Sequence, residues 1–389
     1  MFIDESKIEK IIILLFCFNK SFLSELLCVA VTRQDGGGDT EMEKKEKTTP
    51  VTEENYSLAE TQMIFADYIQ KIRAATNSKT GTGIFMHKRD AMSPNDRTIM
   101  RPNFDTLYSF AVMDLNSTTG NGPTTTTLVM PSSPTGRYQT AICITEDHYL
   151  PLIFDKPGTY TITREELGTP YGMIVVRTQV NMKDTTDMSA AHAMQDQLKL
   201  QSSEVGEYVP SNHWDMDEIL AMRSHFHKLV KDRGISANDM FGRKDQISFL
   251  NHNCGTAQGW GGLPKEQAVY PQIFPSDASG ATAYTLTLEN VPCAAFWSVT
   301  IYDADGYVST AEGAVYNINS AFAVADEGGE KGSSPVTIYF GGKDQEGGEK
   351  KKKKNRMDIM PGWNIALRLY QPTEAYFSGT WSVPTLKPC

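Results

Sequence analysis

The sequence predicts a mainly β fold made of two tandem jelly-roll-type β-sandwiches, with an N-terminal helix and a helical connecting segment. Short apolar or alternating runs recur over 84–181 and again from about 280, separated by turn signals such as Asn121-Gly-Pro123 and Gly168-Thr-Pro170. Such runs are typical of antiparallel strands in sandwiches. Helical periodicity is confined to stretches before and between these two regions, and it therefore predicts a connector rather than an alternating α/β fold.

Three helices are predicted from periodicity and end signals. They span 57–76, 187–200 and 215–232. Ser57 and Glu60 have the spacing of a capping box at the start of the first helix. Its apolar stripe at helical spacing is best explained by packing against a sandwich. Gly234 follows the third helix, where a left-handed residue commonly ends a helix.

Eight runs are long enough and apolar enough to form strands. They are 106–113, 128–130, 138–144, 173–178, 283–288, 295–302, 336–340 and 364–370. The first is apolar on both alternating faces, which is expected of a strand buried inside a sandwich. The run Glu349 to Lys354 lies between two of the later strands, and it is most simply a solvated hairpin loop.

These elements divide the chain into five predicted segments. They are a candidate signal or targeting leader at 1–32, a disordered linker at 33–56, the first helix and sandwich at 57–205, a helical and loop connector at 206–275, and the second sandwich at 276–389. Lys7 and Lys10 precede a short apolar run at 11–18, as in a secretory signal peptide. Asp4 and Glu5 are atypical of one, so the sequence leaves both an exported and a cytoplasmic protein open.

Charge and cysteine usage exclude several classes of function. The net charge is −10, whereas a protein whose main partner is nucleic acid needs a basic surface. The apolar run at 11–18 is far shorter than a membrane span. Outside the leader, Cys143, Cys254, Cys293 and Cys389 show no metal-ligand spacing, and they are compatible with buried thiols or with up to two disulfides.

No metal site or cofactor is predicted. His225 and His227 are two positions apart on a helix and therefore point to different faces, unlike the paired histidines of a helical zinc motif. The glycine-rich segment 253–262 lacks the lysine and hydroxyl residue of a phosphate-binding loop. It is better interpreted as a close-packed loop between domains, with Trp260 as its anchor.

An ordered set of motifs identifies a family. It consists of Arg101-Pro-Asn-Phe-Asp-Thr-Leu-Tyr108, Gly136-Arg-Tyr138, Glu146-Asp-His-Tyr149, Val176-Arg-Thr178, Phe241-Gly-Arg-Lys244, Gly255 to Gly262, Phe296-Trp-Ser298, Tyr302 to Gly306, Pro361-Gly-Trp-Asn364, Arg368-Leu-Tyr370 and Gly379-Thr-Trp381. In this order the set resembles a pair of families, domain of unknown function 1254 (DUF1254) followed by domain of unknown function 1214 (DUF1214), over about residues 57 to 387. The resemblance implies tandem jelly-roll-type sandwiches and frequent export, but no catalytic residues.

The segment 101–108 has the densest group of polar side chains next to an apolar strand run. Asn103, Asp105, Thr106 and Tyr108 are candidates to line a pocket, with Asp105 as a general acid or base and Tyr108 beside it. The structural alternative is that these side chains satisfy loop N–H groups at a strand entrance.

Two arginines extend the candidate site. Arg137 is a candidate catalytic residue, and Arg368 is a candidate for substrate binding, because a guanidinium offers a fork for a carboxylate or a phosphate. For Arg137 the alternative is a buried ion pair with Asp105 or Asp114. Gln139 and Trp260 complete the candidate substrate-binding residues. Glu146, Asp147 and His148 form a further acid–base candidate after a strand.

Two functional hypotheses follow, and the sequence leaves open whether the protein is an enzyme. One is a small-molecule or glycan-directed hydrolase or binder, with its site at the first sandwich or at the cleft between the domains. The alternative is a non-catalytic, carbohydrate- or partner-binding β-sandwich protein. A homo-oligomer is compatible with both. The glycan assignment rests on fold analogy alone.

Overall fold

The computed structural model describes residues 48–90, 92–97, 101–116, 124–203, 205–326, 334–341 and 354–389. The candidate leader at 1–32, most of the linker at 33–56 and the lysine run at 349–353 lie outside these residues. The export prediction is therefore not addressed by the fold. Residues 48–51, within the expected linker, contact the predicted helix 215–232 and the residues just before it. The Thr49 N–H donates to the His213 carbonyl at 2.7 Å, and the Val51 N–H donates to the Glu218 carboxylate at 2.7 Å.

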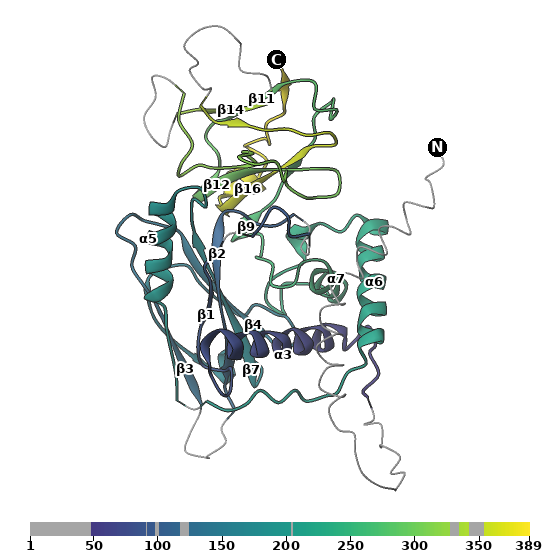
Figure 1. The fold of residues 1–389 in the computed structure, drawn as a ribbon. Helices are drawn as coiled ribbons and strands as arrows, with labels where there is room; N and C mark the ends of the chain where they lie inside the picture. Colours follow the sequence, from purple (N-terminus) through teal and green to yellow (C-terminus); the bar gives the residue numbers. More distant parts are fainter. Residues whose placement is uncertain are drawn as a thin grey trace, which may run out of the picture.

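The described part of the chain is mainly β, with several antiparallel sheets and six α-helices (Figure 1). The helices are α3 (Tyr56–Thr76), α4 (Arg164–Leu167), α5 (Thr185–Asp196), α6 (Met216–Arg233), α7 (Phe249–Gly259) and α8 (Glu374–Phe377). The predicted mainly β class is confirmed, and the jelly-roll connectivity stays a prediction. No helix among the described residues is long and apolar enough to cross a membrane.

The N-terminal half contains two sheets that face each other. The larger has the order β1 (Met86–Lys88), β2 (Thr106–Asp114), β7 (Tyr171–Gln179), β4 (Gln139–Thr145) and β5 (Leu152–Phe154). The smaller has the order β6 (Gly158–Thr163), β3 (Thr125–Met130) and β8 (Lys199–Ser202). Alternate residues of both sheets meet in one buried core, for example Ala141 and Val176 with Leu128 and Ile162. The other face of the larger sheet is also covered, so β2, β4 and β7 are buried almost throughout, and this explains their continuous apolar runs in the sequence.

The opposite face of the larger sheet is covered by α3 and by the C-terminal half. Phe65 and Ile69 of α3 share a core with Phe110 and Val175 of the sheet. Figure 1 shows α3 lying across the sheet near β4 and β7. The apolar stripe of this helix therefore packs on the sheet, as expected from its spacing.

The C-terminal half also has two main sheets. One has the order β10 (Gln272–Ile273), β16 (Asn364–Pro372), β12 (Cys293–Tyr302) and β13 (Asn317–Asn319), with β9 (Ala268–Val269) also on β16. The other has the order β15 (Arg356–Met357), β14 (Val336–Phe340), β11 (Tyr284–Leu288) and β17 (Lys387–Pro388). Their shared core includes Leu286, Ile338, Val299 and Leu367.

The two halves are joined through β12 and β16. In Figure 1 these strands lie at the side of the yellow-green half that faces the N-terminal sheet. Phe296 and Tyr370 extend from them into the core beneath the larger N-terminal sheet. The Tyr302 hydroxyl donates to the Pro102 carbonyl at 2.7 Å, and Gln179 Nε2 donates to Asn319 Oδ1 at 3.2 Å. Polar and apolar contacts therefore fix one half on the other.

The helix ends follow the sequence signals in part. Asp215 caps α6, and Gly234 ends it with a φ of 61°. The capping box predicted at Ser57 and Glu60 is wrong. The N-cap of α3 is Asn55 without a side-chain cap bond, and Glu60 instead accepts a hydrogen bond from Arg223 at 2.6 Å.

Two further expectations are corrected by the fold. The helix expected at 187–200 ends at Asp196, and the chain then enters β8. The glycine-rich segment is not a loop throughout, because α7 covers its first part. Gly255 lies inside α7, where an added Cβ would come within 2.6 Å of the Met240 carbonyl. A glycine here permits close packing of the helix, which a composition-based loop prediction does not detect.

Candidate functional site

Asp105 lies at the junction of the two halves, immediately before β2. Its side chain is fully buried. Oδ2 accepts hydrogen bonds from Ser298 Oγ at 2.6 Å and from the Tyr370 hydroxyl at 2.9 Å, and Oδ1 accepts one from Asn317 Nδ2 at 2.9 Å. All three donors belong to the C-terminal half. The carboxylate therefore fastens the halves together through side chains, rather than through loop N–H groups.

The rest of the segment braces this carboxylate locally. Asn103 Oδ1 accepts the Asp105 N–H at 2.7 Å, and Asn103 Nδ2 donates to Thr106 Oγ1 and to the Tyr108 hydroxyl, both at 3.1 Å. Four of the predicted site residues are thus connected by one hydrogen-bond network. Its outermost member, Tyr108, keeps part of its surface exposed to solvent.

Arg368 joins the same region from β16. Its guanidinium donates to Thr300 Oγ1 at 2.7 Å and to the Tyr302 hydroxyl at 2.5 Å. Burial alone would lower the pKa of Arg368, but the neighbouring Tyr302 and Asp105 outweigh burial and raise it. Arg368 is therefore a permanent positive charge inside the junction.

A second buried guanidinium, that of Arg177 on β7, was not among the predicted site residues. It stands in register with Tyr108 on β2 and with Thr140 on β4. Nη2 donates to the Gly261 carbonyl at 2.6 Å, whereas Nη1 makes no hydrogen bond of normal geometry with any residue that the structure describes. The signal that could have found it is a charged residue inside the apolar run 173–178.

Tyrosines surround Arg177. The centre of the guanidinium lies 5.4 Å from the centroid of the Tyr108 ring, a cation–π contact. Although burial opposes it, the fields of Tyr108, Tyr270 and Tyr138 raise the pKa of Arg177. The buried Tyr138 hydroxyl likewise makes no hydrogen bond of normal geometry among the described residues. We call Arg177, Tyr108, Tyr138, Tyr270 and Tyr370 the arginine–tyrosine cluster.

The cluster is formed by both halves of the protein. The ring of Tyr138 packs against Tyr370 at a centroid distance of 5.6 Å and against Phe296 at 5.3 Å. Burial raises the pKa of Tyr270 to about 12 and that of Tyr370 well above its usual value. At neutral pH these hydroxyls are protonated and can donate hydrogen bonds.

Arg137 lies apart from this cluster. It donates to Asp187 Oδ2 at 2.9 Å and to the Gln179 carbonyl at 2.7 Å. The predicted ion pair with Asp105 or Asp114 is therefore wrong, and the partner comes from the first turn of α5. Gln139 is one residue from Tyr138 but faces the other side of the sheet, where Nε2 donates to Thr178 Oγ1 at 2.8 Å.

Trp260 directly precedes Gly261, whose carbonyl binds Arg177. Its ring stacks on His148 at a centroid distance of 5.4 Å, and Nε1 donates to Thr61 Oγ1 at 3.0 Å. His148 Nε2 accepts the Gly261 N–H at 2.9 Å, so the proton of the neutral ring is on Nδ1. His148 and Trp260 thus hold the loop whose Gly261 carbonyl binds Arg177.

The acid–base candidate at 146–148 is dispersed. Glu146 accepts a hydrogen bond from Gln62 Nε2 at 3.0 Å, and burial raises its pKa. Asp147 accepts one from Thr145 Oγ1 at 2.6 Å. Burial also holds the pKa of His148 well below its ordinary value. These side chains make separate structural contacts and do not converge on one point.

Other chemistry-bearing groups are also accounted for. Within the described ranges, no group of three or more His, Cys, Asp and Glu side chains is arranged to hold a metal ion. His225 lies 3.1 Å from Glu53, and His227 contacts the Ala257 carbonyl at 2.8 Å. The four cysteines in the described ranges are free thiols rather than disulfides.

Comparison with known families agrees with this organisation. Residues 82–142 match the sequence profile of DUF1254, and residues 275–374 match that of DUF1214; both are described as proteins of unknown function. The chain therefore contains a match to each of the two families, in the order DUF1254 and then DUF1214. The resemblance inferred from the motifs is thereby confirmed. The DUF1254 match contains the segment 101–108, and the DUF1214 match contains Arg368 and Tyr370.

One solved structure shares the fold, and a second shows a weaker likeness. The crystal structure of the VPA0106 protein from Vibrio parahaemolyticus matches with a TM-score of 0.59 and 15% identity, covering 87% of this chain and 98% of that one. A putative uncharacterized protein from Burkholderia cenocepacia matches with a TM-score of 0.44 and 13% identity, covering 87% of this chain and 88% of that one. Comparison with curated proteins gives no match.

Proposed function

We propose that this DUF1254/DUF1214 protein binds a small organic anion, of the carboxylate class, at the arginine–tyrosine cluster between its two halves. The observation that supports this most directly is Arg177. Its side chain is 7% exposed and contacts no carboxylate among the described residues. Its Nη1 makes no hydrogen bond of normal geometry there and has the Tyr108 side chain beside it. A buried guanidinium is costly unless an anion pairs with it.

The charges of the junction support the same proposal. Two guanidiniums, those of Arg177 and Arg368, are buried there. Among the described residues of the junction, Asp105 supplies the one fully buried carboxylate, and the partly buried Asp155 acts on Tyr138. Arg368 interacts electrostatically with Asp105, whereas the titratable groups that act on Arg177 are tyrosines. An anionic ligand supplies the missing negative charge. A carboxylate also suits the fork geometry of a guanidinium.

The surrounding side chains suit the organic part of such a ligand. The Tyr138 hydroxyl lies near Thr140 but makes no hydrogen bond of normal geometry among the described residues, so it can donate to a ligand oxygen. Tyr108 and Tyr270 are only partly buried, so the cluster keeps contact with solvent on their side. Aromatic walls with few polar groups are the usual composition of a small-molecule site.

The proposal is one of binding. Asp105 already accepts hydrogen bonds from Ser298, Asn317 and Tyr370. In the proposed site it is therefore a positioning residue, which orients the Tyr370 hydroxyl and holds the halves in register. Tyr108 and Arg177 are the groups that contact the ligand, and Asn103 fixes the Tyr108 hydroxyl.

The test is ligand binding to the full chain and to an Arg177→Gln variant. A panel of acetate, succinate, benzoate, citrate and inorganic phosphate is screened by thermal shift, and hits are measured by calorimetry. We expect at least one carboxylate to raise the melting temperature, because a ligand at a hundred times its Kd stabilises a protein by about 2.7 kcal/mol. Arg243→Gln, which changes an exposed arginine, is the control and should bind like the wild type.

The Arg177→Gln variant has a second readout that separates a ligand site from a structural role. Without ligand, its stability should equal or exceed that of the wild type, because a buried charge without a carboxylate partner has been removed. The proposal fails if no carboxylate binds the wild type, or if the folded variant binds carboxylates as tightly as the wild type does.

A further inference from the structure

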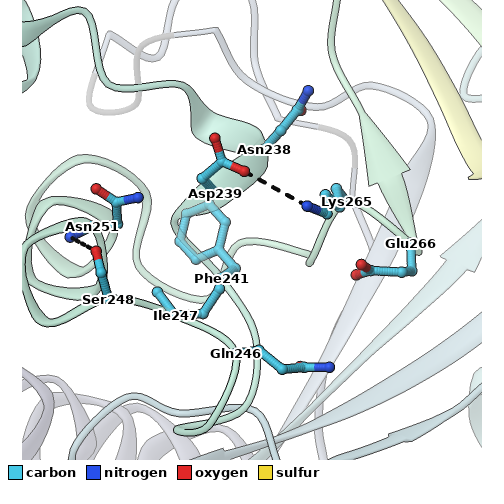
Figure 2. A pocket seen from close by; sticks show the side chains of 9 residues that line it. All are labelled: Asn238, Asp239, Phe241, Gln246, Ile247, Ser248, Asn251, Lys265 and Glu266. Carbon is cyan, nitrogen blue, oxygen red and sulfur yellow. Dashed lines mark hydrogen bonds and ion pairs between the residues drawn. The ribbon is translucent and has the colours of Figure 1, made fainter. Parts of the chain in front are cut away.

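A separate cavity of about 460 Å³ lies outside the junction (Figure 2). It is formed by the short 3₁₀ helix η2 (Ala237–Asp239), the loop that follows it, the start of α7 and the loop before β9. Its volume falls in the usual range for small-molecule sites. None of the residues predicted from the sequence as site residues lines it.

The floor of the cavity is a rigid aromatic ring, that of Phe241. The ring packs so closely on Gly262 that an added Cβ there would lie 2.5 Å from it, and on Gly255 at 3.1 Å. It also meets His148 edge to face at a centroid distance of 6.2 Å. Figure 2 shows the ring in the centre of the cavity lining. Because glycines back it on two sides, its position is set by packing.

The walls are mainly neutral and polar. The side-chain amides of Asn238 and Asn251 have no hydrogen-bond partner among the described residues, and each offers both donors and an acceptor. Gln246 uses its Oε1 to accept the Arg243 N–H at 3.1 Å, which leaves Nε2 as a further donor. Ser248 adds a hydroxyl at the N-cap of α7.

The charged groups at the cavity narrow the class of ligand. Asp239 and Lys265 lie 3.7 Å apart and largely offset one another, and Glu266 adds one further negative charge. This charge distribution disfavours phosphates and carboxylates. The apolar lining is limited to Phe241 and Ile247, so the site does not suit a purely hydrophobic ligand.

We propose that this cavity binds a neutral saccharide, whose C–H face packs on Phe241 while its hydroxyls bond to the surrounding amides. A sugar ring has one apolar face and a rim of hydroxyls that donate and accept, which matches an aromatic floor beneath amide and hydroxyl walls. The site is independent of the organic-anion site, and neither proposal requires the other.

The experiment uses the full chain and a panel of glucose, mannose, galactose, N-acetylglucosamine and cellobiose. Saturation-transfer NMR detects binding, and titration gives the affinity. We expect at least one saccharide to bind, with saturation strongest at ring C–H protons, and an Asn238→Ala/Asn251→Ala double variant to bind at least tenfold more weakly. Asn95→Ala, which changes an exposed asparagine that does not line the cavity, should bind like the wild type.

Both amide positions are partly exposed or exposed, so the double variant is expected to fold. An Arg177→Gln variant should retain saccharide binding, which distinguishes this site from the junction. The inference is overturned if no saccharide in the panel binds the wild type. It is also overturned if the folded double variant binds with unchanged affinity.

Discussion

Replacing Asp105 with alanine removes the acceptor for three side-chain donors from the other half of the protein. Ser298, Asn317 and Tyr370 each lose a hydrogen bond to a buried carboxylate, and Arg368 loses its nearby negative charge. A net hydrogen bond to a charged group contributes about 1.5–3 kcal/mol, and these contacts are too close to be additive. Removing one partner of a buried charge pair costs about 3–5 kcal/mol, which is the loss of stability that we expect here.

Asp105→Asn removes the negative charge of the side chain but keeps nearly the same shape. The amide oxygen can still accept from Asn317, and the hydroxyls of Ser298 and Tyr370 can rotate to accept from the amide nitrogen. We therefore expect a smaller loss, about 2 kcal/mol, from weaker hydrogen bonds and the missing charge. This variant also keeps the prediction testable if the alanine variant does not fold.

The assay is urea unfolding of the full chain at pH 7, followed by circular dichroism and evaluated by linear extrapolation. Asp305→Ala is the matched control, because Asp305 is exposed in the C-terminal half and should leave the midpoint unchanged. If Asp105→Ala unfolds within about 1 kcal/mol of the wild type, the carboxylate does not hold the two halves together, and the reasoning is refuted.

Three further predictions concern stability. Burial lowers the pKa of His252 to about 4 and that of His148 well below 6.5, so the folded protein binds fewer protons than the unfolded chain. Stability should therefore fall as the pH drops from about 6.5 towards 4. The urea midpoint should fall less with pH in His252→Gln than in the wild type. In His225→Gln, which changes a more exposed histidine, it should fall as much as in the wild type. Gly262→Ala places a Cβ 2.5 Å from the Phe241 ring and should lower the free energy of unfolding, measured in urea, by about 1–3 kcal/mol. An unchanged midpoint would mean that the ring moves freely. Arg137→Ala removes the guanidinium that pairs with Asp187 and should destabilise the protein by about 1–3 kcal/mol. Calorimetry should show unchanged carboxylate binding. Loss of binding in the folded variant would place Arg137 in the site.

The candidate site was visible in the sequence only in part. The polar segment 101–108 stood out because a carboxylate, an amide and hydroxyls open directly onto an apolar strand, and the structure joins Asn103, Asp105, Thr106 and Tyr108 in one network. The partners of Asp105 could not be read from the chain, because they lie 193 to 265 positions away. Arg137 seemed an equal candidate, yet α5 supplies its partner, Asp187.

The sequence by itself determined the local structure and the resemblance to the two domain families. Continuous apolar runs mark strands such as β2 and β7, which are buried almost throughout, and end signals such as Asp215 and Gly234 mark α6. Both kinds of signal depend on residues close along the chain. Only the tertiary structure decided which charges meet. It places Arg177 among tyrosines of both halves and forms the cavity around Phe241 from separate loops. These arrangements depend on how sheets and helices pack, and packing partners are set by shape complementarity between segments far apart in the sequence.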